Sequence, residues 1–308
     1  MSTEKPRIVV VGSINIDLVV TVERFPVPGE TIRSTSFVTV PGGKGANQAA
    51  AAALAGGSVT MVGRVGRDIF GSACLENLRS KGVNIDFIKQ DDQAPTGNAM
   101  IAVDTQGQNE LIYTPGANHR VTIEDATAAK QAIADAQMVI LQFELPMMTV
   151  RGVVQLASEL GTKVVVNPAP AEKPPACLLE KVDYLVPNET EAELLTGVNV
   201  TDPDSAAKAA DRLLNEGCKH VIVTLGAQGA LVHDGKTTTH VPARSIQVVD
   251  ATAAGDTFIG AFSVSLATGE PLVEAVRFGC AAATLSVSKL GAQTSIPTRQ
   301  EIERFMYS

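Results

Sequence analysis

Short apolar runs rich in valine and isoleucine alternate along the chain with alanine-rich segments of helical pattern, and this alternation limits the possible fold more than any other feature. The runs are RIVVVG, VTMVGRVG, MVILQF, KVVVN, DYLVP and HVIVTLG. Each is followed, directly or after a loop, by a helical segment. The alternation predicts an α/β protein with a doubly wound, mostly parallel central sheet and helices on both faces.

Two stretches, at about residues 17–37 and 98–113, depart from this alternation. In each of them single apolar and polar residues alternate around turn-forming residues, which is typical of exposed strands. We expect these strands to form a small β-sheet lid outside the main sheet. Because the chain has no internal repeat and no long linker, residues 1–308 are expected to form a single α/β domain that carries the lid.

The composition excludes several classes of function. Hydrophobic residues make up 45% of the 308 residues, and no apolar run reaches the roughly 18–20 residues that a membrane span needs. The first apolar run ends at Gly12 without a small-residue cleavage site, so we expect a strand of a cytoplasmic protein rather than a signal peptide. The net charge of −8, without a basic stretch, opposes binding to nucleic acid.

Cysteine and histidine give no sign of a metal site. The cysteines form no CxxC pair and are widely spaced, so at least three of the four are expected to be small buried apolar residues: Cys74, Cys177, Cys218 and Cys280. The histidines have no metal-ligand spacing and are interpreted as surface or structural residues: His119, His220, His233 and His240.

The segment DATAAGDTF, residues 250–258, carries the strongest functional pattern. Its small residues, ending in Gly255 and Asp256, lead directly into the apolar helical run FIGAFSVSLATG. Small side chains let backbone N–H groups approach a phosphate at a helix N-terminus, and Gly255 is expected to tolerate a conformation that other residues resist. Two interpretations of Asp256 remain open: a helix cap, or a general base for a hydroxyl beside a transferred phosphoryl group.

A second pattern, PGGKGANQ at residues 41–48, precedes another alanine-rich helical run. It is not a P-loop, because Lys44 is followed by glycine rather than serine or threonine. Glycines that open a helix bring its first N–H groups, and here the side chains of Lys44 and Asn47, towards a polar ligand. The alternative is a tight turn with a convenient cap, which three glycines around one lysine make less favoured.

Three weaker patterns follow predicted strands. In GSINID, Asn15 and Asp17 share one face of an extended chain, which suits binding of neighbouring sugar hydroxyls. In NETE, Asn188 is a plausible helix cap, and Asn188 and Glu191 could also act on a phosphate and a hydrated Mg²⁺. The segment TLGAQG fits either a nucleotide loop or a simple glycine turn, with candidate residues at Thr224, Gly226 and Gly229.

These motifs, in this order and together with KLGAQTSIP, make the chain resemble the ribokinase family of carbohydrate kinases over nearly its whole length. The resemblance implies an ATP-dependent kinase that phosphorylates D-ribose at its 5-hydroxyl to give D-ribose 5-phosphate and ADP. It also implies a doubly wound sheet with a β-lid that serves as the interface of a homodimer. The cofactors implied are ATP, Mg²⁺ and K⁺.

The resemblance assigns roles to particular positions. Asp256 would be the catalytic base and contact the sugar, next to an anion hole formed by the amides of Ala253, Ala254 and Gly255. The sugar would be held by Asn15, Asp17, Gly43, Lys44, Asn47 and Glu144. The nucleotide and its metal-bound phosphates would lie near Asn188, Glu191, Thr224, Gly226, Gly229, Gly255 and Cys280, the last a position where similar kinases carry histidine. A potassium ion would be bound by Asp250, Thr252, Ser286, Lys289, Gly291 and Ser295.

Alternative functions are separated by a few features. Deoxyribose, a ketohexose or a nucleoside could replace ribose, but GSINID and GGKGAN contain no aromatic residue on which a nucleobase could stack. A sugar-binding regulator without catalysis would be expected to lack Asp256 or the glycine beside it, and both are present. A dinucleotide dehydrogenase is disfavoured because the first strand is followed by GSINID rather than G-x-G-x-x-G.

Overall fold

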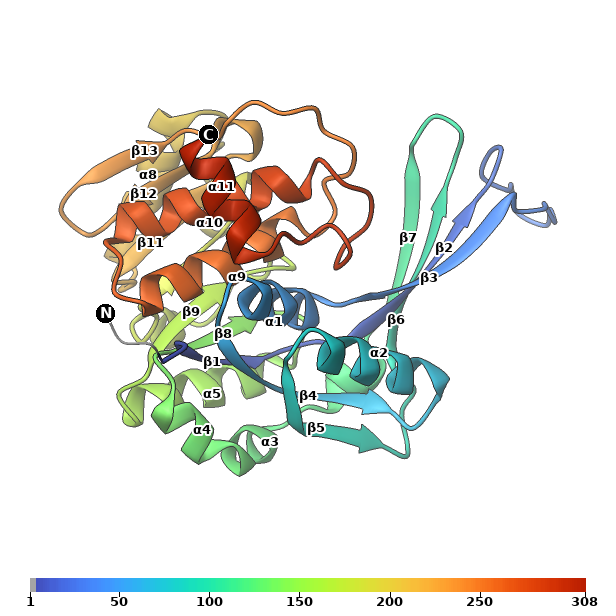
Figure 1. The fold of residues 1–308 in the computed structure, drawn as a ribbon, viewed down its shortest axis with the longest axis horizontal. Coiled ribbons are helices and arrows are strands. Elements are labelled where there is room, and N and C mark those ends of the chain that lie inside the picture. Colours follow the sequence, from blue (N-terminus) through green and yellow to red (C-terminus); the bar gives the residue numbers. More distant parts are fainter. Residues whose placement is uncertain (1–3) are drawn as a thin grey trace.

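The computed structural model describes residues 4–308, and within this range the strands form two sheets (Figure 1). The first two strands explain the split. The run Arg7–Val11 alternates its side chains between two apolar layers, so it belongs in the middle of a covered sheet. The run Asn15–Thr21 is only partly buried and leaves that sheet for a second one.

The central sheet has nine strands within the described residues, and all neighbours pair in parallel except at one edge, where β11, β12 and β13 pair antiparallel. From that edge to the other, the strands are β13 (Thr238–Val241), β12 (Ala230–His233), β11 (His220–Thr224), β10 (Tyr184–Leu185), β9 (Lys163–Asn167), β8 (Met138–Gln142), β1 (Arg7–Val11), β4 (Ser58–Gly66) and β5 (Asn84–Asp91). The predicted α/β sheet is therefore confirmed, although the charged strand β5 and the antiparallel edge were not expected.

Helices cover both faces of this sheet (Figure 1). In β1, Ile8 and Val10 point into one apolar layer and Val9 and Val11 into the other. The first layer includes α1 (Lys44–Leu54), α2 (Ile69–Ser80), α9 (Ala254–Ala267), α10 (Leu272–Ser286) and α11 (Arg299–Tyr307). The second includes α3 (Ile123–Ala128), α4 (Lys130–Asp135), α5 (Met147–Glu159), α6 (Ala176–Leu179), α7 (Glu189–Thr196) and α8 (Pro203–Asn215).

Helix ends follow the capping signals in the sequence. Asp68 accepts a hydrogen bond from Gly71 N at the start of α2, and Thr122 forms a capping box with Asp125 at the start of α3. The helical pattern after Thr122 is divided into α3 and α4 at Ala129. Two short 3₁₀ helices, η1 (Gly116–Arg120) and η2 (Gly226–Gln228), lie in loops.

The second sheet stands beside the main body, on the side opposite the C-terminus (Figure 1). Its strands, in spatial order, are β3 (Ser36–Gly42), β2 (Asn15–Thr21), β6 (Gly97–Val103) and β7 (Asn109–Thr114). The segments expected for the lid, at about 17–37 and 98–113, include most of β2, β6 and β7. They miss most of β3, because the run VTVPGG was not interpreted as a strand.

Within residues 4–308, no helix combines the length and the apolar composition needed to cross a membrane.

The burial of the cysteines agrees with expectation. Three cysteines are buried and one, Cys177, is exposed. Burial raises the pKa of the thiols of Cys74, Cys218 and Cys280 to about 12, so they remain protonated at neutral pH.

Candidate active site

The predicted site residues gather at the carboxyl edge of the central sheet, where open α/β sheets bind their ligands. Asn15 lies shortly after β1, Glu144 after β8, Asn188 after β10 and Thr224 at the end of β11. Residues 188 and 224 form a parallel bridge, and Thr224 N donates to Pro187 O at 2.9 Å. Sequence segments far apart in the chain therefore meet along one edge.

The glycines that precede and open α1 let the helix press against the loop after β1. Gly43 has φ of 89°, and a Cβ on it would lie 2.7 Å from Asn15 N. A Cβ on Gly45 would lie 2.6 Å from Ser13 N, so only glycine fits there. The contact places the start of α1 against the backbone of residues 12–15.

Asn118 of η1 holds the loop after β1 from the other side. Its Oδ1 accepts a hydrogen bond from Ile14 N at 2.9 Å, and its Nδ2 donates to Asn15 Oδ1 at 2.6 Å. Because the Asn118 side chain is fully buried, these bonds are sheltered from water. The orientation of the Asn15 amide therefore depends on where η1 lies.

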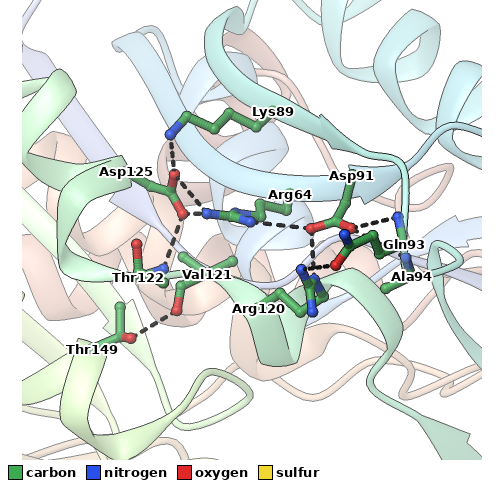
Figure 2. Close-up of polar contacts among 10 residues, drawn as sticks. All are labelled: Arg64, Lys89, Asp91, Gln93, Ala94, Arg120, Val121, Thr122, Asp125 and Thr149. Carbon is green, nitrogen blue, oxygen red and sulfur yellow. Dashed lines mark hydrogen bonds and ion pairs between the residues drawn. The ribbon is translucent and has the colours of Figure 1, made fainter.

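A network of charged residues fixes η1 to the sheet (Figure 2). Arg120 Nε donates to Asp91 Oδ2 at 2.8 Å, while Arg64 bridges Asp91 at 3.1 Å and Asp125 at 2.8 Å. Both acids are buried. Asp91 Oδ1 also accepts from the backbone N–H groups of Gln93 and Ala94, in the loop that leads to β6. One network thus anchors both connections between the lid half β6–β7 and the central sheet.

Two carboxylates, Asp17 and Glu144, lie on the sugar side of the predicted site. Glu144 Oε2 accepts from Lys44 N at 3.1 Å and from the hydroxyl of Ser13. Burial, with a smaller contribution from the charge of Glu144, raises the pKa of Asp17 to about 6. A Cβ on Gly42 would lie 2.5 Å from Asp17 Oδ2, so this glycine makes room for the carboxylate.

The lid adds an aromatic residue that the motifs did not indicate. Tyr113 of β7 pairs with Ala99 of β6, which pairs with Asp17 of β2, so the three side chains share one face of the lid. Burial and the charge of Glu144 raise the pKa of the Tyr113 hydroxyl, whereas hydrogen bonds with Asn118 and Asn15 lower it. Its hydroxyl therefore reaches the sugar side of the site.

Asp256 is not the cap of α9. The cap position is Ala253, and Asp256 is the third residue of the helix. Both carboxylate oxygens accept side-chain amide hydrogen bonds from α1, from Asn47 Nδ2 and from Gln48 Nε2, each at 2.9 Å. Burial raises the pKa of Asp256, while Lys44 and the two amide donors oppose this rise. The helix-cap interpretation is therefore wrong, and a buried, oriented carboxylate remains.

The unusual backbone conformation before α9 belongs to alanine rather than glycine. Ala253 has φ of 59°, whereas Gly255 takes an ordinary helical conformation, contrary to expectation. A left-handed alanine costs about 1–2 kcal/mol and is typical of functional loops. A Cβ on Gly255 would meet no atom within 4 Å, so glycine there leaves open space at the helix N-terminus.

Lys44 is the cation that the buried carboxylates of this site share. Burial lowers its pKa, but the charges of Asp256, Glu144 and Glu191 outweigh burial and raise it, so the ammonium stays protonated. Glu191 itself forms a capping box with Asn188, and burial raises its pKa. An anionic ligand at this point would meet one fixed positive charge and the N-terminus of α9.

Two adjoining cavities meet at the first turn of α9. The smaller, of about 180 Å³, is lined by Lys44, Glu191 and the segment 253–256, among others. The larger, of about 460 Å³, has a mainly apolar lining that includes Ile246, Val248 and Phe258. It also contains all the positions expected near the nucleotide apart from Glu191, namely Asn188, Thr224, Gly226, Gly229, Gly255 and Cys280.

Three of the residues expected to bind potassium, Asp250, Thr252 and Gly291, are joined by hydrogen bonds. Asp250 accepts from Thr252 N at 2.9 Å and from Gly291 N at 2.8 Å, which ties the loop before α9 to the segment after α10. Although burial acts to raise the pKa of Asp250, these hydrogen bonds lower it overall. Lys289 directs its side chain to Glu301 at 3.1 Å, so only its backbone carbonyl could contribute. Within residues 4–308, no cluster of acids, histidines and cysteines has the form of a metal site.

Comparison with known proteins assigns the family. The pfkB family carbohydrate kinase model matches residues 5–299. The chain belongs to this family of carbohydrate kinases. A ribokinase of Haemophilus influenzae is 40% identical over 302 residues, covering 98% of this chain and 99% of that protein. A deoxyribokinase of Salmonella typhi is 35% identical over 303 residues, covering 97% and 98%. The structure of an Arabidopsis thaliana ribokinase complexed with ribose and ATP has a TM-score of 0.94 at 35% identity, covering 99% of this chain and all of that one.

This carbohydrate kinase also has site residues that sequence reasoning missed. Five of them contact predicted residues through polar side chains: Ser13, Gln48, Tyr113, Asn118 and Asn167. The sixth, Gln142, contacts Gln48. Two of them carried a usable signal. Gln142 is a polar residue within the apolar run MVILQF, and Gln48 precedes six residues of which five are alanine. A polar residue in such a position needs a buried partner.

Proposed function

We propose that this kinase transfers the γ-phosphoryl group of ATP to the 5-hydroxyl of D-ribose, giving D-ribose 5-phosphate and ADP. The observation that carries the proposal is the position of Asp256. Its carboxylate is bonded to Asn47, which belongs to the sugar motif, and it lines the cavity that adjoins the apolar one. A base between an acceptor pocket and a nucleotide pocket is what phosphoryl transfer to an alcohol requires.

In this mechanism Asp256 accepts the proton of the acceptor hydroxyl as its oxygen attacks the γ-phosphorus, and ADP leaves from the opposite side. Burial raises the pKa of Asp256 and so makes it a better proton acceptor than an exposed aspartate. The first N–H groups of α9, at residues 253–255, face the developing charge. Ala254 N is engaged with Ala251 O at 3.2 Å, so Gly255 supplies the freer amide.

The nucleotide would occupy the 460 Å³ cavity, with its base on the apolar lining and its phosphates towards Lys44 and Asn188. When bound, Mg²⁺ neutralises phosphate charge and orients the transferred group. The donor set fits an ion held through water. Glu191 already accepts hydrogen bonds from Asn188 N, Asn188 Nδ2 and Asn167 Nδ2, at 2.9, 3.0 and 3.4 Å, which leaves room for a water-mediated contact.

A potassium ion is proposed beside the anion hole, held by Asp250, Thr252, Ser286, Lys289, Gly291 and Ser295. The oxygen donors available there are one carboxylate, hydroxyls and backbone carbonyls, which suit a hard monovalent cation. Ser286 and Ser295 are fully buried. When bound, K⁺ adds positive charge near the helix N-terminus and orders the loop that contains the strained Ala253.

Ribose is chosen as acceptor because the curated relatives at 40% identity are ribokinases, whereas the deoxyribokinase relative is 35% identical. The lack of aromatic residues in the sugar motifs does not decide against a nucleoside, since Tyr113 enters the site from the lid. Asp17 is expected to accept hydrogen bonds from the 2- and 3-hydroxyls, and its ionised form is the acceptor. ATP and a phosphorylated sugar also fit a cytoplasmic location.

A homodimer through the lid is proposed from its exposed apolar side chains. Phe37, Val38, Met100, Leu111 and Ile112 are between 51% and 68% exposed. They lie on three strands of the lid, β3, β6 and β7. The strand register places Phe37, Met100 and Ile112 on one face, and Val38 and Leu111 on the face that also carries Asp17. Contiguous apolar side chains of this size favour burial against another surface, and an identical lid offers a complementary one.

We expect Asp256→Asn to fold normally and to lose about 10²–10⁴-fold in kcat, because the hydroxyl proton then has no acceptor. Ribose-dependent release of ADP in a coupled assay measures this. Asp135→Asn, an exposed position at the end of α4, is the matched control and should keep its turnover. Near-normal turnover of folded Asp256→Asn would show that another group is the base.

We expect ribose to be preferred over 2-deoxyribose by roughly 10–10³-fold in kcat/KM, because the analogue leaves the Asp17 carboxylate without a partner. Asp17→Ala should reduce ribose turnover more than deoxyribose turnover and erase much of the preference. Steady-state kinetics on a panel of pentoses, hexoses and nucleosides measures it. A wild-type enzyme that uses deoxyribose, fructose or a nucleoside better than ribose would contradict the choice of sugar and leave the kinase assignment intact.

We expect turnover in K⁺ to exceed turnover in Na⁺ at matched ionic strength and saturating Mg²⁺, and to be lowest in a tetramethylammonium salt. Asp250→Asn should remove the difference between K⁺ and Na⁺, because it weakens the only carboxylate of the proposed set. Initial rates in the three salts test this. Equal rates in all three for the wild type would rule out a functional monovalent cation.

We expect sedimentation equilibrium to give twice the chain mass for the wild type and the single-chain mass for Leu111→Glu, because a buried charge opposes lid pairing. Met148→Glu, at a 75% exposed position on α5, is the matched control and should remain dimeric. A wild type that sediments as a single chain at micromolar concentration would refute pairing through the lid.

A further inference from the structure

Asp256 is held by neutral side-chain amides. Gln48 Nε2 donates to Oδ1 and Asn47 Nδ2 donates to Oδ2, both at 2.9 Å. Gln48 is fully buried and Asp256 is 7% exposed, so water does not compete strongly for these bonds. Two donors on two oxygens fix both the position and the rotation of the carboxylate.

The direction of hydrogen bonding around Gln48 is set by the carboxylate. An ionised carboxylate only accepts, so the nitrogen of Gln48 must face Asp256 and its oxygen must face away. That oxygen accepts from Gln142 Nε2 at 2.7 Å. Gln142, at the end of β8, is also fully buried. The two glutamines therefore form a donor chain that ends at the carboxylate.

A second donor chain reaches the other oxygen with the same direction. Asn77 Nδ2 of α2 donates to Gln293 Oε1 at 2.5 Å, and Gln293 Nε2 donates to Asn47 Oδ1 at 3.0 Å. Asn47 then donates to Asp256. Four elements distant in sequence thus supply amides whose dipoles all point towards one carboxylate.

One unpaired atom is explained by this chain. Gln142 Oε1 is buried and has no hydrogen-bond partner among the residues that the structure describes. It faces Gly12, where a Cβ would lie 2.1 Å away. An unpaired buried acceptor is destabilising, and turning the amide over would pair two oxygens face to face at Gln48. The unpaired oxygen is therefore a consequence of the amide orientation in which Gln142 Nε2 donates to Gln48.

We propose that Gln48, oriented by Gln142, is a positioning residue for the general base: its amide holds Oδ1 of Asp256 and favours the ionised, proton-accepting form. The inference rests on the proposed function in taking Asp256 as the base. Gln48 Nε2 also lies 3.2 Å from Asn167 Oδ1, and Asn167 Nδ2 donates to Glu191. The same amide therefore connects the base to the phosphate side of the site.

Neutral donors suit this task better than a cation would. Lys44 on α1, Glu144 after β8 and Glu191 on α7 are the charged groups whose fields act on Asp256, and Lys44 is the single cation among them. A second cation in contact with the carboxylate would lower its pKa strongly and weaken it as a base. An amide fixes the geometry with a smaller effect on basicity.

The test compares Gln48→Met and Gln142→Met with the wild type, in kcat and KM measured between pH 5.5 and 9.5. Methionine keeps the volume and removes the donor. Removing a hydrogen bond to the charged form raises the pKa of Asp256, so the acid limb of kcat should move up by about one unit for Gln48→Met. Activity should fall by up to about tenfold on the acid side of the wild-type limb and match the wild type at high pH, while KM for the sugar changes little.

Gln142 contacts Gln48 and acts on Asp256 only through it, which gives a second expectation. Gln142→Met should shift the limb in the same direction but less, and the double variant should match Gln48→Met alone rather than add to it. Gln131→Met, an exposed position on α4, is the matched control and should leave the profile unchanged. Carbon-13 NMR titration of the Asp256 carboxyl, assigned by its loss in Asp256→Asn, measures the same shift without catalysis.

Opposite results would overturn the inference. A loss of kcat in Gln48→Met that is equal at every pH, or an unshifted carboxyl titration, would mean that Gln48 only packs the core. Additive shifts in the double variant would mean that Gln142 acts independently. If Gln48→Met does not fold, an unshifted limb in Gln142→Met refutes the chain. A wild type that turns over a different sugar contradicts the proposed substrate but leaves this test unchanged.

Discussion

The close crossing of α1 and α9 is the constraint on which the rest of the site depends. A Cβ on Gly260 of α9 would lie 2.5 Å from the Cβ of Ala51 and 2.6 Å from Ala52 N, so the helices touch with almost no side chain between them. The alanine run of α1 is almost fully buried for the same reason. Only at this separation can side chains as short as Asn47 and Gln48 reach Asp256. The small residues that look like simple helix formers therefore set the position of the base.

The buried carboxylates at the base of the lid and in the site are stabilised by different kinds of partner. At the base of the lid, Asp91 and Asp125 are paired with Arg64, Arg120 and Lys89, and this charge pairing lowers the pKa of both acids (Figure 2). In the site, neutral amides and a single ammonium leave the pKa of Asp256 raised. Strong ion pairs suit an anchor that must stay ionised, whereas a base must be able to take a proton.

The sequence predicts those parts of the fold and site that depend on local pattern. Apolar runs rich in valine and isoleucine, which alternate with helical segments, identify most of the central strands. Glycine-rich motifs identify the loops at their ends. Strand β5, with the sequence NIDFIKQD, escapes this reasoning because it lies at a sheet edge and carries charges. The roles of Asn118 and Gln142 depend on contacts with residues about 100 positions away. The apolar run around Gln142 indicates that its side chain needs a buried partner, but no local signal identifies that partner. The left-handed backbone conformation occurs at Ala253, whereas local preference would assign it to Gly255.

Ala253 and Gly255, at the start of α9, meet different structural requirements. At position 255 a side chain would project into open space at the junction of the two cavities, so glycine preserves access to the helix N-terminus. At position 253 the backbone is left-handed, and Ala253 O accepts from Thr257 N at 2.8 Å to start the helix. The strain is tolerated there because the turn directs the first amides of α9 towards the cavity. Packing between α1 and α9 then fixes Asp256 one residue beyond those amides, so the base and the anion-binding amides share one rigid turn.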